Sequence, residues 1–448
     1  MEPQINYQFK LRKITTNCKT AQYKRQNNLF KLRKPIDKKK TAQYNLIELA
    51  GGAEMIIREK YLKEIRPFYD SDLVKIITGI RRCGKSVILK TVYDEISAKT
   101  PNTLFLDFED ANDFKLAGTV DKLLGYIDKK RKGGKCYIFL DEVQNIKDWQ
   151  IAVKTLRLHD NSVFISGSNS KLLSGEFATQ LSGRYVSFKI RPFVYKEIVQ
   201  YASELKKEVS HLDYLVFGGF PKRFEMPDEA STVKYLEDLE DTIVIKDLIK
   251  RYRIKRPELF KRFVSYILRN NARLMSARSI HKYLVGQGLE CSSNTILNYM
   301  HYLKEAYVIE ELQKYSTKTK RELSYNPKVY NSDICFNSLK ADNKRYDLDH
   351  NLENIVYNEL LYMGYDLKLY DNNGKEIDFL ATKDGKSYFV QVAYSVLDDK
   401  AYRREFAAFG ELDNSNQKIL ITNDDIDYST STVRHIRFKD FLLMNSLS

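Results

Sequence analysis

Short apolar runs separated by a helical segment follow one another in the chain after residue 70. Residues 73–78 (LVKIIT), 136–140 (CYIFL) and 162–166 (SVFIS) are largely apolar, which is typical of strands buried on both faces of a sheet. Residues 87–96 read as a helix between the first two runs. This alternation predicts an α/β fold built around a parallel sheet.

A glycine loop directly follows the first predicted strand. Residues 79–86 read GIRRCGKS, which matches the phosphate-binding pattern GxxxxGK[ST] at every fixed position. Gly79 and Gly84 allow backbone conformations that a Cβ resists, so that loop N–H groups and the next helix can point at phosphate oxygens. A chance glycine turn is the alternative, and the flanking strand and helix argue against it. The residues expected to contact a nucleotide are Gly79, Arg81, Arg82, Cys83, Gly84, Lys85, Ser86 and Val87.

An acidic pair ends the second predicted strand. Asp141 and Glu142 follow the apolar run about 55 residues after the glycine loop, where the pattern indicates a Walker B motif. Ser86 and Asp141 would bind Mg²⁺, Lys85 would reach the β- and γ-phosphates, and Glu142 would orient or deprotonate the attacking water. ATP and Mg²⁺ are therefore the expected cofactors, and a hydrolase is favoured over a kinase.

Polar and basic residues follow the third predicted strand. Asn169 is the first candidate for a side chain that contacts the γ-phosphate or positions water, and Ser168 is the second, although both residues are also ordinary turn formers. Arg184 is the candidate for stabilising transition-state charge, in its own site or in that of a neighbouring subunit. Arg191 is the fallback, and both arginines could be plain surface residues.

The ordered set of motifs resembles a known family. Residues 55–448 are similar to bacterial and archaeal AAA-type ATP-binding proteins that carry a C-terminal domain with a restriction-endonuclease-like fold. The resemblance implies that Lys85, Ser86, Asp141 and Glu142 are the ATP residues, that Asn169 is the sensor and that Arg184 is the arginine finger. The segments that carry it are GIRRCGKS (79–86), FLDEVQ (139–144), SGSNSKLLSGE (166–176), LSGRY (181–185), RPFVYKE (191–197), FGGFPKR (217–223), TIVIKDLIKRYRIK (242–255), EIDF (376–379) and FVQVAYS (389–395).

The expected organisation has five parts. A basic, repetitive tail at 1–54 precedes an AAA-type P-loop core at 55–200. A helical linker or lid at 201–256 and a winged-helix-like domain at 257–335 are expected next. The last part, 345–448, is expected to be a restriction-endonuclease-like α/β domain.

The middle segment shows the element pattern of a winged helix. Helices are expected at 258–270, 279–287 and 293–306, the last one capped by Ser292 or Ser293, and are followed by two strands at 307–315 and 321–329. In a DNA-binding interpretation the third helix enters a groove. Packing of the same unit on the ATPase is the alternative, because the third helix is poor in Arg and Lys. The DNA-facing candidates are Asn294, Asn298, His301 and Lys304 on that helix and Lys318, Lys320 and Arg321 on the wing.

The C-terminal segment places polar residues in the order of a metal-dependent nuclease. Glu353 on a helix, Asp378 on one strand and Gln391 on the next occupy the positions of the metal ligands in restriction-endonuclease-like enzymes. The usual lysine two residues after the last ligand is replaced by Ala393, and Gln391 is a weaker Mg²⁺ ligand than a carboxylate. Ser395 or Lys400 could substitute for the lysine. A binding module without cleavage activity is the alternative.

Composition and charge bear on the nature of the N-terminal tail and on the cellular compartment of the protein. The 448 residues are 43% hydrophobic and 30% charged, with a net charge of +15, and the first 54 contribute twelve Lys or Arg and four Asp or Glu. Residues 9–23 and 30–44 repeat each other at ten of fifteen positions, so that the tail reads as a disordered segment, as upstream sequence before a start at Met55, or as a nucleic-acid-binding arm. Five scattered cysteines and no membrane or signal segment favour the cytoplasm.

Three functions compete at this point. The first is a Mg²⁺-dependent ATPase that acts on DNA or on a protein–DNA complex. The second is an ATP-controlled switch that regulates a non-catalytic module binding DNA or protein. The third is an ATP-activated, metal-dependent nuclease. DNA, another protein and a second copy of the chain are the candidate partners, and a membrane is not expected.

Overall fold

The computed structural model describes residues 56–173, 181, 183–315, 326–372, 374–410, 412 and 415–448. The repetitive tail and the wing residues Lys318, Lys320 and Arg321 lie outside this part of the chain. Within the described ranges, no helix combines the length and the apolar character needed to cross a bilayer.

A five-stranded parallel sheet forms the first part of the described chain. Its strand order is β2-β3-β4-β1-β5, so β4 lies between the strand that precedes the glycine loop and the strand that ends in the acidic pair. The predicted α/β fold with a parallel sheet is therefore confirmed. Its strands are β1 (Val74–Thr78), β2 (Thr103–Asp107), β3 (Cys136–Asp141), β4 (Asn161–Gly167) and β5 (Tyr185–Lys189).

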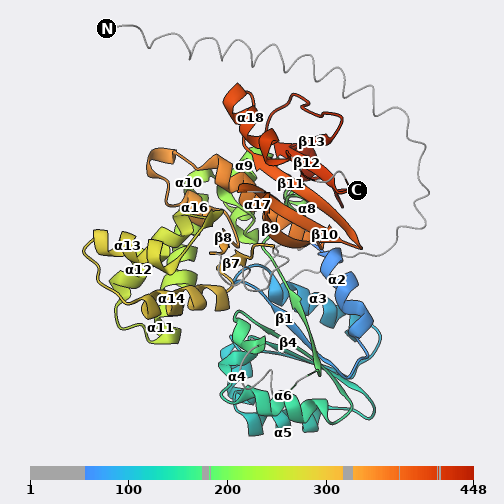
Figure 1. Cartoon of the computed structure of the whole chain (residues 1–448). Coiled ribbons are helices and arrows are strands. Elements are labelled where there is room, and N and C mark those ends of the chain that lie inside the picture. Colours follow the sequence, from blue (N-terminus) through green and yellow to red (C-terminus); the bar gives the residue numbers. More distant parts are fainter. Residues whose placement is uncertain are drawn as a thin grey trace, which may run out of the picture. The chain divides into compact units, whose positions relative to one another are not determined.

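Helices cover both faces of this sheet (Figure 1). Alternate strand residues face opposite sides, and the core accordingly divides into two clusters. Ile77, Phe139 and Phe164 pack with α3 (Lys85–Ser97) in one cluster. The other cluster contains Ile76, Ile138, Ile165 and residues of α5 (Val120–Lys130) and α6 (Trp149–Arg157). A short helix, α4 (Ala111–Ala117), precedes α5. The parallel strands end at one edge, where the motif residues follow them.

The middle of the chain is mostly helical. Three helices near the predicted positions are confirmed, and the Ser292 hydroxyl caps the third by accepting from the Thr295 N–H at 3.2 Å. The antiparallel strand order is β6-β8-β7. The elements are α8 (Tyr195–Glu204), α9 (His211–Phe217), α10 (Glu229–Glu240), the π-helical turn η5 (Asp241–Lys246), α11 (Asp247–Tyr252), α12 (Pro257–Arg269), β6 (Arg273–Leu274), α13 (Ala277–Gly286), α14 (Ser293–Glu305), β7 (Ile309–Leu312) and β8 (Lys328–Asn331).

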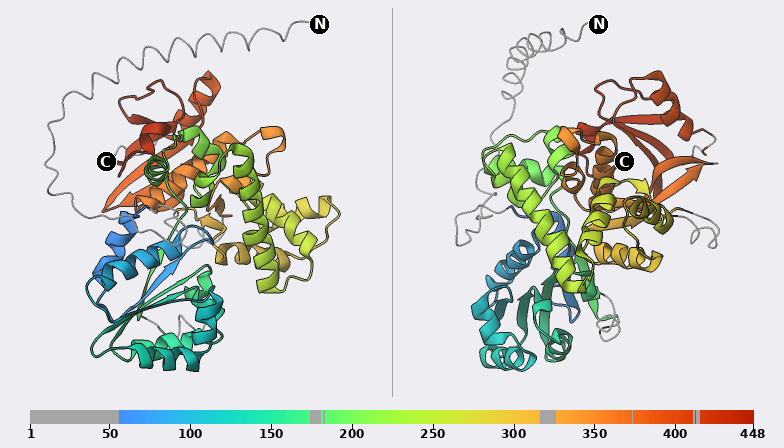
Figure 2. Two further views of the ribbon diagram at one scale, coloured as in Figure 1. Left: turned by 180° about the vertical axis from the view of Figure 1, so that it is seen from behind. Right: turned by 90° about the vertical axis from the view of Figure 1, so that its left-hand side faces the viewer.

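The last hundred residues form a second five-stranded sheet, of order β13-β12-β11-β10-β9. Its first three strands along the chain are antiparallel and the last three are parallel. Helix α17 packs against the sheet (Figure 2). Residues 433–441 add a strand and a short helix that the sequence pattern did not predict. The elements are α17 (Leu348–Tyr362), β9 (Asp366–Asn372), β10 (Lys375–Lys383), β11 (Lys386–Ala393), α18 (Asp399–Ala408), β12 (Gln417–Thr422), β13 (Val433–Arg437) and α19 (Phe438–Phe441).

Candidate nucleotide-binding site

The glycine loop connects β1 to α3 in the conformation that its sequence predicts. Gly79 has φ 145° and Gly84 has φ 98°, both in the region that a side chain disfavours. A Cβ on Gly79 would lie 2.1 Å from the carbonyl oxygen of Ile190, so any larger residue would push the loop away from the segment after β5. Cys83 is buried under the loop, and its thiol donates to the same Ile190 oxygen at 3.4 Å. The Cys83 side chain thus supports the loop from below.

A buried ion pair braces the loop from outside the motif. Arg58 donates Nε and Nη2 to the two carboxylate oxygens of Glu197 at 2.8 and 2.7 Å. Its third nitrogen, Nη1, donates to the carbonyl oxygen of Cys83 at 3.0 Å. Both side chains are buried, and a bidentate arginine–carboxylate pair has a fixed geometry. Sequence reasoning missed this brace because the two residues are 139 positions apart and belong to no local motif.

Asp141 lies at the end of β3 among hydroxyl groups. Ser166 on β4 donates its Oγ to Asp141 Oδ1, and a hydrogen bond from Ser86 also acts on the Asp141 carboxylate. Burial raises the pKa of Asp141 to about 6, although these hydrogen bonds oppose the rise. The structure therefore brings together Ser86 and Asp141, the two predicted Mg²⁺ ligands, and adds Ser166, whose only sequence signal was its position at a strand end.

Glu142 is held next to Lys85. Its Oε1 lies 3.8 Å from Lys85 Nζ, and that ammonium also donates to the Ile80 carbonyl oxygen at 3.2 Å. Gln144 Nε2 and Ser168 Oγ both donate to Glu142 Oε2, the second at 3.4 Å. Gln144 is the last residue of the FLDEVQ segment, and its sequence position indicated no role for it. These contacts fix the carboxylate of the predicted water-activating residue.

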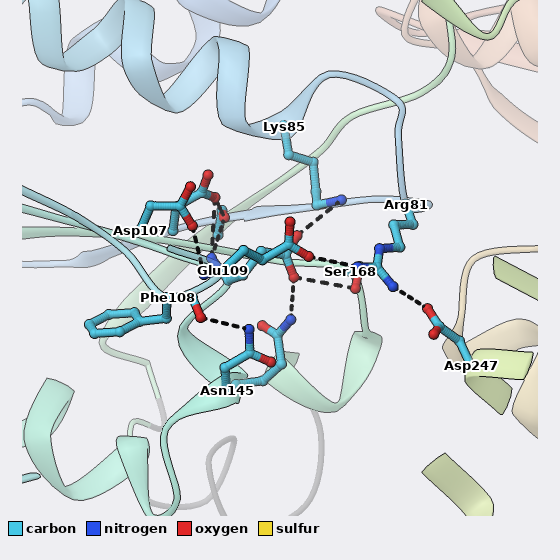
Figure 3. A network of polar contacts seen from close by, with 12 residues as sticks. Arg81, Lys85, Asp107, Phe108, Glu109, Asn145, Ser168 and Asp247 are labelled. Carbon is cyan, nitrogen blue, oxygen red and sulfur yellow. Dashed lines mark hydrogen bonds and ion pairs between the residues drawn. The ribbon is translucent and has the colours of Figure 1, made fainter. Parts of the chain in front are cut away.

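The arginine at the third position of the loop makes a three-way ion pair (Figure 3). Arg81 Nη1 lies 2.5 Å from Asp247 Oδ2 at the start of α11, and Arg81 Nη2 lies 2.7 Å from Glu109 Oε1 after β2. Asp107 accepts from the Glu109 backbone N–H at 2.8 Å, and burial raises the pKa of Asp107. Asn145 Nδ2 donates to the Phe108 carbonyl oxygen at 3.2 Å, which joins the segments after β2 and β3. Arg82 is exposed instead, with φ 67°.

The two sensor candidates follow β4 at the same sheet edge as the glycine loop. Asn169 and Ser168 are both buried, and Ser168 contacts Glu142 as described. Because β4 is the neighbour of both β1 and β3, its carboxyl end places these residues between the loop and the acidic pair. The structure thus gathers Asn169 and Ser168 with the other predicted site residues.

Arg184 lies at the opposite end of the strands. It precedes β5, and its carbonyl oxygen accepts from the N–H of Val74 at 3.1 Å, at the start of β1. The glycine loop follows the end of β1, so the five residues of that strand separate Arg184 from it by roughly 16 Å. Arg184 is exposed and does not join the site of its own chain.

Arg191 connects the ATPase part to the later domains. Its guanidinium lies 2.8 Å from Glu310 Oε1 on β7 and donates to Asn358 Oδ1 on α17 at 3.1 Å. Arg191 and Lys189 hold the pKa of Glu310 well below its usual range, against the effect of burial. The guanidinium of the fallback finger candidate is therefore engaged by the later domains, although the neighbouring Ile190 carbonyl lies against the glycine loop.

A lysine occupies the centre of the predicted C-terminal metal site. Lys328 Nζ, on β8, lies 2.7 Å from Glu353 Oε1, 2.9 Å from Asp378 Oδ1 and 2.8 Å from Glu376 Oε1. Burial alone would lower the pKa of Lys328, but the three carboxylates hold it well above its ordinary value. Burial and the charge of Asp378 raise the pKa of Glu353, while the Lys328 ammonium opposes that rise. The carboxylates thus neutralise an internal ammonium group.

Gln391, the third predicted metal ligand, is used within the fold. Its Oε1 accepts from the Asp378 backbone N–H at 3.2 Å, and its Nε2 donates to Glu405 Oε2 at 2.8 Å. Lys400 is exposed at the start of α18, so the lysine that reaches Asp378 comes from β8 instead. In the described part of the chain no group of three or more His, Cys, Asp or Glu residues could hold a metal ion. No sequence pattern had indicated Lys328.

The DNA-facing candidates on α14 differ in their exposure. Asn294, Asn298 and His301 are exposed on this helix. Lys304 instead pairs with Glu311 at 2.8 Å. The outward face of α14 is therefore nearly neutral.

Comparisons with known families match three consecutive segments. Residues 71–199 match an AAA domain family, residues 210–342 match a domain of unknown function (DUF8612), and residues 349–441 match another domain of unknown function (DUF4143). The AAA match covers the parallel sheet and the glycine loop. It supports the AAA part of the resemblance, whereas the restriction-endonuclease part has no such support.

Among solved structures, a Walker-type ATPase of Pyrococcus abyssi has a TM-score of 0.42 and 14% identity, covering 63% of this chain and 95% of that one. DnaA of Aquifex aeolicus bound to AMPPCP has a TM-score of 0.31 and 17% identity, with 56% and 90% covered.

Two relatives align over most of their length. A protein of Haemophilus influenzae described as uncharacterized is 33% identical over 379 residues, which are 82% of this chain and 93% of the relative. A similarly described protein of Methanocaldococcus jannaschii is 30% identical over 403 residues, covering 85% and 88%. The chain therefore belongs to the family that these two proteins represent, and its residues 71–199 form an AAA-type P-loop ATPase domain.

Proposed function

We propose that the protein is a Mg²⁺-dependent ATP hydrolase. The convergence of Lys85, Ser86, Asp141 and Glu142 at one sheet edge carries this proposal. The loop N–H groups and Lys85 bind the phosphates, and Glu142 accepts a proton from the attacking water. Ser168 and Gln144 keep the Glu142 carboxylate oriented for that transfer.

The donor set of this site suits magnesium. Ser86 and Asp141 offer hard oxygen ligands, which Mg²⁺ prefers, and Asp141 is a buried carboxylate that a cation would stabilise in its charged form. A Mg²⁺ ion bound with ATP would neutralise charge on the phosphates. Asn169 would sense the γ-phosphate from the end of β4. Arg184 would serve the site of a neighbouring copy, because it lies far from its own.

Nucleotide state would control the later domains by way of their contacts with the ATPase. Arg81 contacts α11, and Arg191 contacts β7 and α17. The order helix, strand, two helices and two strands over α12–β8 supports the winged-helix interpretation of the middle segment. The proposal is thus an ATPase whose cycle moves a module that binds DNA or protein.

The C-terminal domain serves in this proposal as a binding or structural module. Lys328 pairs with the carboxylates that a nuclease would need for metal, and the amide of Gln391 is engaged by Asp378 and Glu405. The ATP-controlled switch is therefore favoured over the nuclease. Loss of Lys328 pairing would be required before Glu353 and Asp378 could bind a cation.

The test uses two variants of the full chain. Lys85→Ala should lose both the calorimetric signal of ATP with Mg²⁺ and ATP turnover. Glu142→Gln should still bind ATP, with Kd within about threefold, while turnover falls about 100-fold or more. Unchanged turnover in either variant would refute the proposed hydrolase. Incubation of the wild type with duplex DNA and Mn²⁺ should give no cleavage, and cleavage lost in Asp378→Ala would restore the nuclease alternative.

A further inference from the structure

The positive charge of the globular part is concentrated in one short segment. Residues 250–282 hold eleven Lys or Arg and a single acid, Glu258, which gives a net charge of +10. Residues 55–448 carry only +7 in total, so the rest of the globular part is slightly acidic. A local excess of this size creates a field that favours a polyanion.

These basic residues lie on the outside of the fold. Ten of the eleven are exposed, and Arg251 is half-buried. The acid of the segment, Glu258, is already paired with Lys261 at 2.9 Å, and Arg273 pairs with Asp347 at 3.2 Å. The exposed residues are Lys250, Arg253, Lys255, Arg256, Lys261, Arg262, Arg269, Arg273, Arg278 and Lys282. We call these ten residues the basic surface.

Helix geometry aligns a large part of the basic surface. On α12, Arg262 and Arg269 are seven positions apart, which is about two full turns, so they lie nearly in line on the solvent face, with Lys261 beside Arg262; the opposite face is buried in the core. On α13, Arg278 and Lys282 are four positions apart and therefore lie on one stripe. The two helices lie side by side in Figures 1 and 2.

An aromatic pair joins the two helices. The rings of Tyr266 on α12 and Tyr283 on α13 stack with their centroids 4.2 Å apart, and 39% of Tyr283 is exposed. Tyr266 lies between Arg262 and Arg269 along α12, and Tyr283 directly follows Lys282. Cations next to a partly exposed aromatic face suit the phosphates and bases of a nucleic acid. A membrane is a poorer fit, because the apolar face of α12 is buried.

We propose that the basic surface of α11–α13 is the nucleic-acid-binding surface of this protein and that it binds the phosphate backbone of DNA. This proposal rests on the proposed function and names the partner and its place. It differs from the winged-helix expectation, in which α14 and the wing carry the contacts: α12 and α13 supply the charge that α14 lacks. Recognition of phosphates makes the binding independent of base sequence.

The test compares two triple variants of the full chain that remove the same charge. Arg262→Gln/Arg278→Gln/Lys282→Gln removes three cations from the basic surface. Lys129→Gln/Lys130→Gln/Lys132→Gln removes three exposed cations at the end of α5 and after it. Fluorescence anisotropy measures the affinity for a 20-base-pair duplex over a range of salt concentrations. Both proteins keep the basic tail, so the tail does not contribute to the difference.

The basic-surface variant should bind the duplex at least tenfold more weakly, with a log–log salt slope smaller by about 2 to 3, because each lost phosphate contact removes about 0.9. The control variant should stay within twofold of the wild type. The proposal would be overturned if both variants lost the same affinity for the duplex or if the basic-surface variant lost none. It would also be overturned if the protein bound poly-glutamate or phosphatidylserine vesicles more tightly than the duplex. Basal ATP turnover should be unchanged in both variants, so a failure here is distinct from a failure of the hydrolase proposal, which Lys85→Ala tests.

Discussion

Arg81 in the phosphate-binding loop forms an ion pair with Asp247 at the start of α11, with 2.5 Å between Nη1 and Oδ2. Arg81 precedes Lys85 by four positions in the loop, and Asp247 begins the helix that leads into the basic surface. A triphosphate bound at the loop would compete with Asp247 for the Arg81 guanidinium. The pair therefore joins the phosphate-binding loop directly to α11.

Asp247→Asn should uncouple α11 from the nucleotide. In the wild type, ATP should increase amide hydrogen exchange over residues 247–252, because the triphosphate withdraws Arg81 from Asp247. In the variant this exchange should already be high without ATP and should change little on its addition. Asp241→Asn is the matched control, since it breaks the exposed pair with Lys246 in the same segment. Identical nucleotide responses in the two variants would contradict the coupling.

Asp141→Asn should stabilise the protein in the absence of nucleotide and magnesium. Burial raises the pKa of Asp141 to about 6, so the folded state disfavours the charged carboxylate. The folded state therefore gains stability from a protonated Asp141. This gain is fully present below about pH 4 and is lost as the pH rises through about 6. Removing the charge should therefore raise the free energy of unfolding at pH 7.5 by about 1 to 3 kcal/mol, and much less at pH 4.5.

Urea titrations of the wild type and Asp141→Asn at these two pH values measure the effect. Addition of ATP and Mg²⁺ should reverse the order, because only the wild type gains the full stabilisation of bound ligand. An equal gap between the two proteins at both pH values would show that the buried charge has no such cost.

Gln144→Met should slow hydrolysis without weakening binding. Gln144 Nε2 donates to Glu142 Oε2, and its loss frees the carboxylate to rotate away from the water. The expected change is a fall in kcat of about tenfold with the Kd for ATP within twofold, which is the pattern of a positioning residue. Asn145→Met is the neighbouring control, since Asn145 donates to Phe108 and not to Glu142. A larger kcat loss in the control would place the positioning role elsewhere.

Lys328→Met should destabilise the protein because it leaves Glu353 and Asp378 buried without their cation. The expected loss is about 3 kcal/mol, the usual result of removing one partner of a buried pair. Adding Glu353→Gln to this variant should recover part of the stability, which a double-mutant cycle measures by urea unfolding. If the double variant is less stable than Lys328→Met by the full cost of Glu353→Gln alone, the two residues are not coupled.

Arg184 should act on the ATP site of a neighbouring copy. Arg184→Ala and Lys85→Ala should each hydrolyse ATP poorly, and mixing the two proteins should restore turnover, because a mixed interface joins an intact loop to an intact arginine. Mixing Lys85→Ala with Glu142→Gln is the control, since both defects lie in the same site and no mixed interface repairs either. Full activity of Arg184→Ala alone would remove this arginine from the mechanism.

The sequence indicated which residues would gather at the carboxyl edge of the first sheet, because the motifs that contain them are local. Gly79 to Ser86 form a continuous loop, and Asp141 and Glu142 end a strand whose apolar run identifies it. Parallel strands end at one edge, so residues after different strands converge without any knowledge of packing. The same reasoning gave Asn169 and Ser168, which follow β4 at that edge.

Contacts between distant segments could not be predicted in this way. Lys328 fills the C-terminal carboxylate cluster from a strand 50 residues before Asp378, and Arg58 reaches Glu197 across 139 residues. Neither pair leaves a local pattern, because an ion pair requires only that two side chains meet in space.

The chain by itself thus determined an α/β ATPase domain, its loop and its acidic pair, since motif spacing and strand periodicity are properties of neighbouring residues. Only the tertiary structure decided that Arg184 lies away from its own loop, that Arg81 joins the loop to α11 and that Lys328 neutralises Glu353 and Asp378. The physical reason is that burial and the distance between charges, which fix these roles, arise when separate segments pack together.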